Sequence, residues 1–204
     1  PHADPVKAAP MKKYMREQFE YLGIKSPQMA ALQKEFIAAH GLPSLENLDV
    51  IVRDLWSLPQ REFQYLALGL VGTFEKKVDE DFITTLEHLI THKSWWDTVD
   101  SIAGHSVGVM FKRFPKVKAK YLKKWRKSDN FWLRRTTLLF QLGYKEETDF
   151  ELLCDLIREN LGSDEFFINK AIGWALRQYA WTNPTAVKKF VKATKELHPL
   201  SRRE

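Results

Sequence analysis

The chain of 204 residues lacks several features that would point to common classes of protein. Its single cysteine, Cys154, excludes an internal disulfide and any multi-cysteine zinc or iron–sulfur site. No stretch approaches the ~18 uncharged apolar residues of a membrane-spanning helix. The absence of a Gly-rich phosphate loop, a Gly-x-Ser-x-Gly motif and a Cys-x-x-Cys pair disfavours nucleotide hydrolysis, serine esterase and dithiol redox chemistry. One cysteine is typical of a reducing compartment, so we expect a cytoplasmic protein without a membrane partner.

Signals for β-strands are nearly absent as well. No run of β-branched residues alternates with polar ones, and no Asn-Gly or Asp-Gly turn occurs. Apolar residues instead recur every three or four positions in segment after segment, and breakers such as Ser26-Pro27 and Asn183-Pro184 separate the segments. The pattern predicts an all-α fold of roughly eleven helices joined by short loops.

A repeat of 35 residues runs through the middle of the chain. The segments KSWWDTVDSI, KSDNFWLRRTTL and GSDEFFINKAIGW share a small or acidic residue, paired aromatics and an amphipathic helix. Equivalent aromatic residues recur at this interval: Trp96, Phe131 and Phe166. Charged residues four positions later recur likewise: Asp100, Arg135 and Lys170. The period predicts an α-solenoid of HEAT-like two-helix repeats, forming one domain over residues 1–204, with these charges in a row on a concave face. Chance similarity among amphipathic helices is the alternative.

The positive charge of the chain is concentrated in one segment. The net charge of +6 divides into +10 for residues 112–135 and −4 for the rest of the chain. Residues 112–135 contain eleven basic residues and one acidic residue. Aromatic residues are interleaved with these bases: Tyr121, Trp125, Phe131 and Trp132. Such a block predicts a polyanion-binding, basic face, and a merely solvated helix face is the alternative.

Asp100 is the strongest candidate for a chemical role. It lies four residues after Trp96 and therefore on the same helix face, one turn further along. A carboxylate beside aromatic residues on a concave surface is partly desolvated, which suits electrostatic stabilisation or general-base catalysis. The alternative is that Asp97 and Asp100 only complement the positive end of the helix dipole, and for Asp97 we prefer that alternative.

Three further residues are candidates for contacts with a nucleic acid. Arg135 and Lys170 could bind phosphate oxygens or, as the alternative, form salt bridges within the solenoid. One of Arg134 and Arg135 should face inward and the other outward. Trp174 lies one turn after Lys170, where its ring could stack on a base or belong to the core.

A metal site is not expected. His88 and His92 have the i, i+4 spacing of a metal pair, but Leu89 stands where a zincin motif has glutamate. A structural role for the histidines is the better interpretation, and we predict no metal and no other cofactor. Cys154 stands among leucines and is expected to be a small buried side chain.

The last four residues, Ser201 to Glu204, have the Ser-x-x-Glu pattern of a capping box. This pattern predicts a helix that begins at Ser201, and hence a chain truncated at its C-terminus before one more helix.

Eight segments carry a resemblance to a known family: PMKKYM, FEYLGI, IVRDLWSLPQREFQ, KSWWDTVDSI, SDNFWLRR, LLFQL, EFFINKAIGWALRQYA and PLSRRE. In this order and spacing, over nearly the whole chain, they resemble the bacterial alkylpurine DNA glycosylases of the AlkD type, a HEAT-like repeat family. The resemblance implies that Asp100 is the catalytic aspartate and that Arg135 holds the DNA backbone near the lesion. It implies further contacts with the lesion or its sugar: Trp96, Trp174 and Tyr14. Residues expected at the DNA backbone are Lys170, Phe166, Phe167, Lys123, Lys124 and Lys127.

The implied activity is that of a DNA-3-methyladenine/7-methylguanine glycosylase, which hydrolyses the N-glycosidic bond of purines alkylated at N3 or N7 in double-stranded DNA. An alkylated purine is cationic and already a good leaving group, so no general acid is needed, unlike in glycoside hydrolases. We see no lysine beside Asp100 that could form a Schiff base, and therefore expect a monofunctional enzyme without strand cleavage. The resemblance also implies a bacterial, nucleoid-associated protein with no obligate protein partner. The alternative is a non-catalytic HEAT-like scaffold that binds DNA structure or a protein.

Overall fold

A computed structural model describes residues 2–204, and its contacts divide the chain into two compact units, residues 1–85 and 86–204. Both units are helical, and between residues 2 and 204 the one strand-like pairing is an isolated β-bridge from Glu20 to Gln60. The predicted all-α fold is therefore confirmed. Within the same range, every helix is too short or too polar to cross a membrane.

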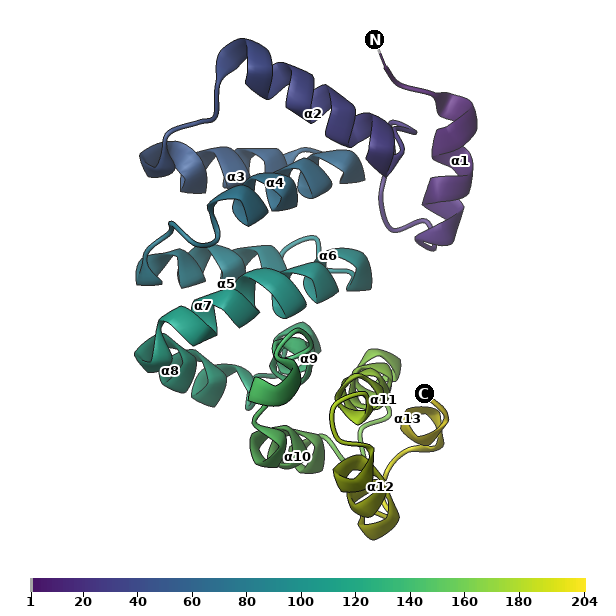
Figure 1. Cartoon of the computed structure of the whole chain (residues 1–204). Helices are drawn as coiled ribbons and strands as arrows, with labels where there is room; N and C mark the ends of the chain where they lie inside the picture. Colours follow the sequence, from purple (N-terminus) through teal and green to yellow (C-terminus); the bar gives the residue numbers. More distant parts are fainter. Residues whose placement is uncertain (1) are drawn as a thin grey trace. The chain divides into compact units, whose positions relative to one another are not determined.

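The first unit is built from four α-helices and two short 3-10 helices (Figure 1). They are α1 (Pro5–Tyr14), α2 (Ser26–His40), η1 (Leu45–Asn47), α3 (Leu48–Ser57), α4 (Arg61–Phe74) and η2 (Glu80–Phe82). Helix α5 (Ile83–Thr91) begins in this unit and continues into the second.

Two buried polar side chains at the start of α4 hold the loops of the first unit. The Glu62 carboxylate accepts hydrogen bonds from the three amide groups of residues 22–24 at 2.8–3.2 Å. The Gln64 amide donates to the carbonyl oxygens of Trp56 and Leu58 at 3.0 and 2.9 Å, where α3 ends. Glu62 and Gln64 thus supply hydrogen-bond partners for backbone amides of the loop at residues 22–24 and for backbone carbonyls at the end of α3.

The second unit stacks its helices in chain order, from α7 and α8 to α9 and α10 and then to α11 and α12 (Figure 1). The helices of this unit are α6 (Trp96–Ser101), η3 (Ile102–Val107), α7 (Gly108–Arg113), α8 (Pro115–Trp125), α9 (Phe131–Leu139), η4 (Lys145–Glu147), α10 (Phe150–Glu159), α11 (Phe166–Ala180), α12 (Pro184–Ala193) and α13 (Pro199–Arg203). This arrangement is that of a helical repeat solenoid, as predicted.

The 35-residue register is visible in the helix starts. Helices α6, α9 and α11 begin at Trp96, Phe131 and Phe166, which are the three positions that the repeat predicts. The caps of the later two helices are Asn130 and Glu165, whose side chains each accept a hydrogen bond from an amide of the first turn. Because the helices start in register, equivalent side chains of successive repeats lie side by side.

A π-helix separates α6 from α7 and was not predicted. It spans Ile102–Val107, directly after the helix that carries Asp100. Directly after it, Gly108 begins α7 and allows a close approach to the C-terminal end of α9, since a Cβ atom there would lie 2.7 Å from the carbonyl oxygen of Phe140. The Tyr144 hydroxyl donates a hydrogen bond of 2.7 Å to the Gly108 carbonyl. π-Helical turns occur frequently at functional sites.

The predicted helix start at Ser201 is wrong. Helix α13 begins at Pro199, and the His198 ring caps it by accepting a hydrogen bond from an amide of the first turn at 3.1 Å. Ser201 therefore lies inside the helix, and its hydroxyl donates to the carbonyl oxygen of Asn169 at 2.8 Å. Proline at the first helical position is the physical reason for the earlier start, because its ring fixes a helical φ and it has no amide to satisfy.

The aromatic residues of the basic block are mostly core. Tyr121, Trp125 and Trp132 are buried, so their spacing among lysines reflects the inner face of α8 and α9.

Cys154 is buried, as expected, and burial raises the pKa of its thiol to about 11. The rings of His88 and His92 stack at 3.9 Å, and residues 2–204 contain no group of three potential metal ligands.

Gly173 lies on α11 where α13 crosses it at close range. A Cβ atom there would lie 2.8 Å from the carbonyl oxygen of Ser201 and 2.3 Å from Cβ of Glu204, well inside van der Waals contact. We expect Gly173→Ala to displace α13 and to lower the free energy of unfolding by about 1–3 kcal/mol, as measured by urea denaturation. Gly72→Ala in α4 is the matched control, because nothing lies within 4 Å of a Cβ there. If both variants were equally stable, α13 would not approach α11 this closely.

Candidate active site

A cavity of about 340 Å³ in the second unit brings together most of the predicted site residues. Its walls come from α6, α9, α11 and the end of α13. The residues that line it are Trp96, Asp100, Arg135, Phe166, Phe167, Lys170, Trp174, Arg177 and Glu204. The predicted row of Asp100, Arg135 and Lys170 therefore lines a single cavity.

The centre of the cavity is a buried ion pair between Asp100 and Arg135. The Arg135 Nε and Nη2 atoms donate to the Asp100 Oδ1 and Oδ2 atoms at 2.7 and 2.8 Å, which is the bidentate geometry of a strong pair. Nη1 of the same guanidinium donates to the carbonyl oxygen of Phe167. The side chains are 4% exposed for Arg135 and 13% exposed for Asp100. One guanidinium thus joins α6, α9 and α11.

The surroundings of Asp100 act on its pKa in opposite directions. Burial is the largest effect and raises the pKa of the Asp100 carboxyl above its ordinary value of 3.8. The hydrogen bonds and the charge of Arg135 lower that pKa, and the charge of Asp97 raises it. Since a carboxylate has about four lone-pair sites and Arg135 uses two, Asp100 keeps acceptor capacity for a ligand in the cavity. A partly desolvated carboxylate held in one orientation is suited to stabilising a cation or orienting a water molecule.

A second ionic cluster, formed by Glu204, Lys170 and Arg177, lies at another wall of the cavity. The sequence did not predict Glu204 or Arg177 for the site. Glu204 pairs with the Lys170 ammonium, and its Oε2 atom lies 3.0 Å from Nη1 of Arg177. Hydrogen bonds from Lys170 and then Arg177 lower the pKa of Glu204. Arg177 could have been found, because it lies three residues after Trp174 and seven after Lys170 and so shares their helix face.

The expectation that no lysine beside Asp100 acts as a Schiff-base nucleophile stays a prediction, and Lys170 is the lysine to which it applies. The two residues line the same cavity, but the Lys170 amino group is engaged by Glu204.

Aromatic rings form much of the remaining wall. Phe166 is 52% exposed, and its ring packs edge-on against Phe167 at 5.3 Å. The Phe167 ring in turn packs against Trp95 at 5.2 Å. Trp96 and Trp174 are half-buried and line the cavity, so part of each ring remains open to a ligand.

The other predicted site residues lie elsewhere. Tyr14 belongs to the first unit, where it ends α1 with 70% of its surface exposed. Lys123, Lys124 and Lys127 are exposed on α8 and the turn after it, and none of them lines the cavity. Lys124 forms an ion pair with Glu87 at 2.7 Å. Arg135 faces inward and Arg134 is less buried, as the Arg134-Arg135 pattern predicts.

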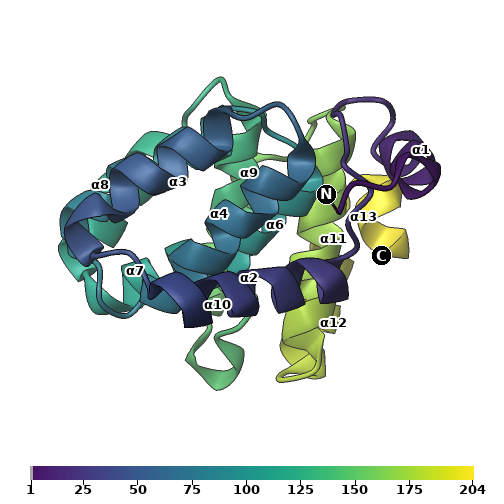
Figure 2. The same ribbon diagram turned by 90° about the horizontal axis from the view of Figure 1, so that it is seen from above.

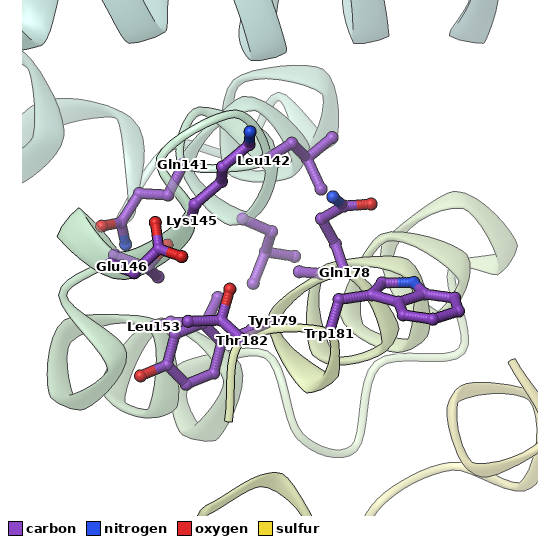
Figure 3. A pocket seen from close by; sticks show the side chains of 12 residues that line it. Gln141, Leu142, Lys145, Glu146, Leu153, Gln178, Tyr179, Trp181 and Thr182 are labelled. Carbon is purple, nitrogen blue, oxygen red and sulfur yellow. The ribbon is translucent and has the colours of Figure 1, made fainter. Parts of the chain in front are cut away.

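Two further cavities lack a comparable charged centre. One, of about 190 Å³, lies between α9, α10 and α11, and Figure 3 shows Gln141, Lys145, Gln178 and Trp181 around it. Its Gln141 side chain is used structurally, since it exchanges two hydrogen bonds with the backbone of Asp149. The other, of about 670 Å³, is an apolar space of the first unit beside α2. The Asp100 cavity is therefore the best candidate for chemistry.

Comparisons with known proteins place the chain in a class. Residues 1–204, the whole chain, match a family described as DNA alkylation repair enzyme. The chain therefore belongs to this family of repair enzymes. It is also similar to a solved structure described as a predicted DNA alkylation repair enzyme from Enterococcus faecalis. The similarity amounts to 32% sequence identity and a TM-score of 0.91, over 99% of this chain and 94% of that one. Among curated proteins no match was found.

Removal of Arg135 tests the buried pair. Arg135→Met leaves the Asp100 carboxylate buried without its partner, so we expect the free energy of unfolding at neutral pH to fall by about 3–5 kcal/mol. The pKa of Asp100 should rise further, and the folded state should then bind a proton more readily than the unfolded state. The destabilisation should therefore shrink as the pH falls through the raised pKa. Urea denaturation across a pH series measures both effects.

The double variant Asp100→Asn/Arg135→Met supplies the control for this prediction. It removes the buried charge together with its partner, so its loss of stability should be smaller than the sum of the two single losses. Additive losses would mean that the two side chains do not stabilise each other.

Proposed function

We propose that this repair enzyme is a DNA glycosylase that hydrolyses the N-glycosidic bond of purines alkylated at N3 or N7 in double-stranded DNA. The observation that carries the proposal is the Asp100 carboxylate, held by Arg135 in a cavity with aromatic walls. The other carboxylate of this cavity, Glu204, is engaged by Lys170 and Arg177, which leaves Asp100 as the one carboxylate available for chemistry. A lone carboxylate is enough only where the leaving group needs no protonation, and a cationic alkylpurine meets that condition.

In the proposed reaction, the bond between the sugar C1′ and N9 of the purine breaks, and its electron pair neutralises the positive charge of the base. The sugar gains oxocarbenium character, which the Asp100 carboxylate stabilises across a short distance in a site of low polarity. Water then forms the new bond to C1′ and loses a proton to Asp100 or to solvent. The products are the free neutral base and an abasic site.

Arg135 has the role of a positioning residue in this proposal. It holds both carboxylate oxygens of Asp100, and a third N–H donates to the Phe167 carbonyl. Because only 4% of the side chain is exposed, its two remaining N–H groups are poorly accessible to a phosphate. The predicted contact of Arg135 with the DNA backbone is therefore less favoured than its salt-bridge alternative. Lys170 and Arg177 are better placed for phosphates, because their cations are less buried and their partner Glu204 can be exchanged for another anion.

The aromatic walls and the basic block complete the proposed interface. Trp96 and Trp174 offer π faces to a cationic nucleotide. Lys123, Lys124 and Lys127 lie outside the cavity and supply phosphate contacts to DNA beyond the segment that holds the lesion. In the free protein and in the proposed complex, an anion engages Lys170, first Glu204 and then a phosphate, so it is not a free amine for a Schiff base. We therefore propose a monofunctional glycosylase that leaves the abasic strand uncut.

Asp100→Asn is the decisive variant for the proposed activity. The amide keeps the shape of the side chain but removes the negative charge, so release of 7-methylguanine from methylated duplex DNA should fall at least about 100-fold. Binding to the same DNA should be retained or tighter, because a negative charge facing phosphates is lost. Single-turnover release of free base and a gel-shift titration measure the two quantities.

Two controls make the result specific. Duplex DNA containing uracil, a neutral base, should be a poor substrate of the wild-type protein if leaving-group charge drives the reaction. Asp97→Asn changes the neighbouring carboxylate, which does not line the cavity, and should keep most of the activity. If the wild-type protein bound methylated DNA but released no base, a non-catalytic scaffold would be the correct description.

A further inference from the structure

The outer face of α8 carries a stripe of lysines that the cavity does not use. At 100° per residue, three lysines of this helix fall within an arc of about 60°, and the turn after the helix supplies a fourth. The stripe consists of Lys116, Lys120, Lys123 and Lys127, all exposed. The buried side chains of α8 point the opposite way: Val117, Tyr121, Leu122 and Trp125.

Within residues 2–204 the stripe lysines form no ion pairs with acidic residues, whereas the neighbouring basic residues do. Lys112 pairs with Glu147 at 2.8 Å, and Arg126 pairs with Glu159 at 2.7 Å. These ion pairs and that of Lys124 lie beside the stripe and tie the α7–α8 region to neighbouring helices. The four stripe lysines form no ion pair within residues 2–204.

The stripe lowers the stability of the free protein. Lys116 stands in the first turn of α8, where the helix dipole disfavours a cation. Lys116 and Lys120, like Lys123 and Lys127, have the i, i+4 spacing at which like charges repel. A structural role would place acids among these residues, but α8 contains none. Compensation by an external polyanion accounts for the arrangement.

The position of the stripe separates it from the candidate active site. Helix α8 lies on the opposite side of the second unit from α13, whose end closes the cavity (Figure 1 and Figure 2). The inner face of α8 packs against α7 and α9, so the stripe points away from the helices that hold Asp100. A phosphate bound in the cavity and a phosphate bound on the stripe therefore lie on different faces of the unit.

We propose that the outer face of α8 binds a second segment of duplex DNA while the cavity holds the first. The stripe extends over about 16 Å of helix axis, at 1.5 Å per residue. Over a similar length, duplex DNA presents roughly nine negative charges. Binding is electrostatic and independent of sequence, and it allows the protein to bridge two segments of DNA and to transfer between them.

A bridging assay tests this surface. An immobilised duplex captures the protein, and a second, fluorescent duplex of unmodified DNA is then added. The wild-type protein should retain the second duplex, with a strong dependence on salt. The variant Lys116→Gln/Lys120→Gln/Lys123→Gln/Lys127→Gln should lose that retention, and the slope of log K against log salt for the second duplex should fall by about 4. Its binding to the first duplex should stay within about twofold.

The matched control removes four exposed lysines of α12 and the turn after it: Lys188, Lys189, Lys192 and Lys195. This control has the same change in net charge and should still bridge. Equal loss in both variants would show a general charge effect and overturn the proposal. A stripe variant that keeps bridging, or that loses binding to the first duplex equally, would also overturn it, as would a wild-type protein that retains no second duplex.

Two readouts separate this inference from folding and from the proposed glycosylase activity. The melting temperature of the stripe variant should equal or exceed that of the wild-type protein, because like-charge repulsion is relieved, and a lower value would show that the lysines are structural. The inference rests on the proposed function only in taking DNA as the polyanion. Bridging without any base release would refute the glycosylase and leave the second DNA surface standing.

Discussion

The ion pair between Asp100 and Arg135 is the interaction on which the rest of the site depends. Removing two charges from water is costly, and the attraction between them compensates only when the geometry is good and the remaining donors have partners. Here the pair is bidentate, and one of the three remaining N–H groups of Arg135 donates to the Phe167 carbonyl. Because the three residues lie on α6, α9 and α11, a single guanidinium fixes three successive repeats around one carboxylate.

The repeat explains why this pair forms at all. Asp100 and Arg135 are 35 residues apart, and other ion pairs of the second unit join residues at nearly the same separation. Lys112 and Glu147 are also 35 residues apart, and Lys170 and Glu204 are 34 apart. Side chains at equivalent heights of adjacent repeats therefore meet as a consequence of the stacking. The catalytic candidate is one member of a series of inter-repeat contacts, and it differs from the others in being buried.

Much of this arrangement could be predicted from local patterns. Trp96, Phe131 and Phe166 begin their helices as the register requires, and Asp100 lies one turn into the first of them. Spacing places Arg135 next to Asp100, but it does not say whether the arginine binds a phosphate or the carboxylate. That choice depends on how far Arg135 is buried, which is a property of the packed repeats.

Other features depend on long-range contacts that no short pattern contains. The Ser-x-x-Glu pattern identifies Glu204 only as half of a capping box, because its partners Lys170 and Arg177 lie about thirty residues earlier in the chain. The cap of α13 is His198, a residue that is seldom assigned this function. The sequence indicates the π-helix after α6 only indirectly, through Gly104 and Gly108 within an otherwise helical stretch.

The central claim is that the ionised Asp100 carboxylate drives the departure of a cationic base. The most direct test compares two titrations: the single-turnover rate of 7-methylguanine release as a function of pH, and the titration of the Asp100 carboxyl followed by NMR. Since burial raises the pKa of Asp100 above 3.8, the rate should fall on acidification with a midpoint above that value and equal to the NMR midpoint. A rate that stays constant while Asp100 becomes protonated would contradict the account.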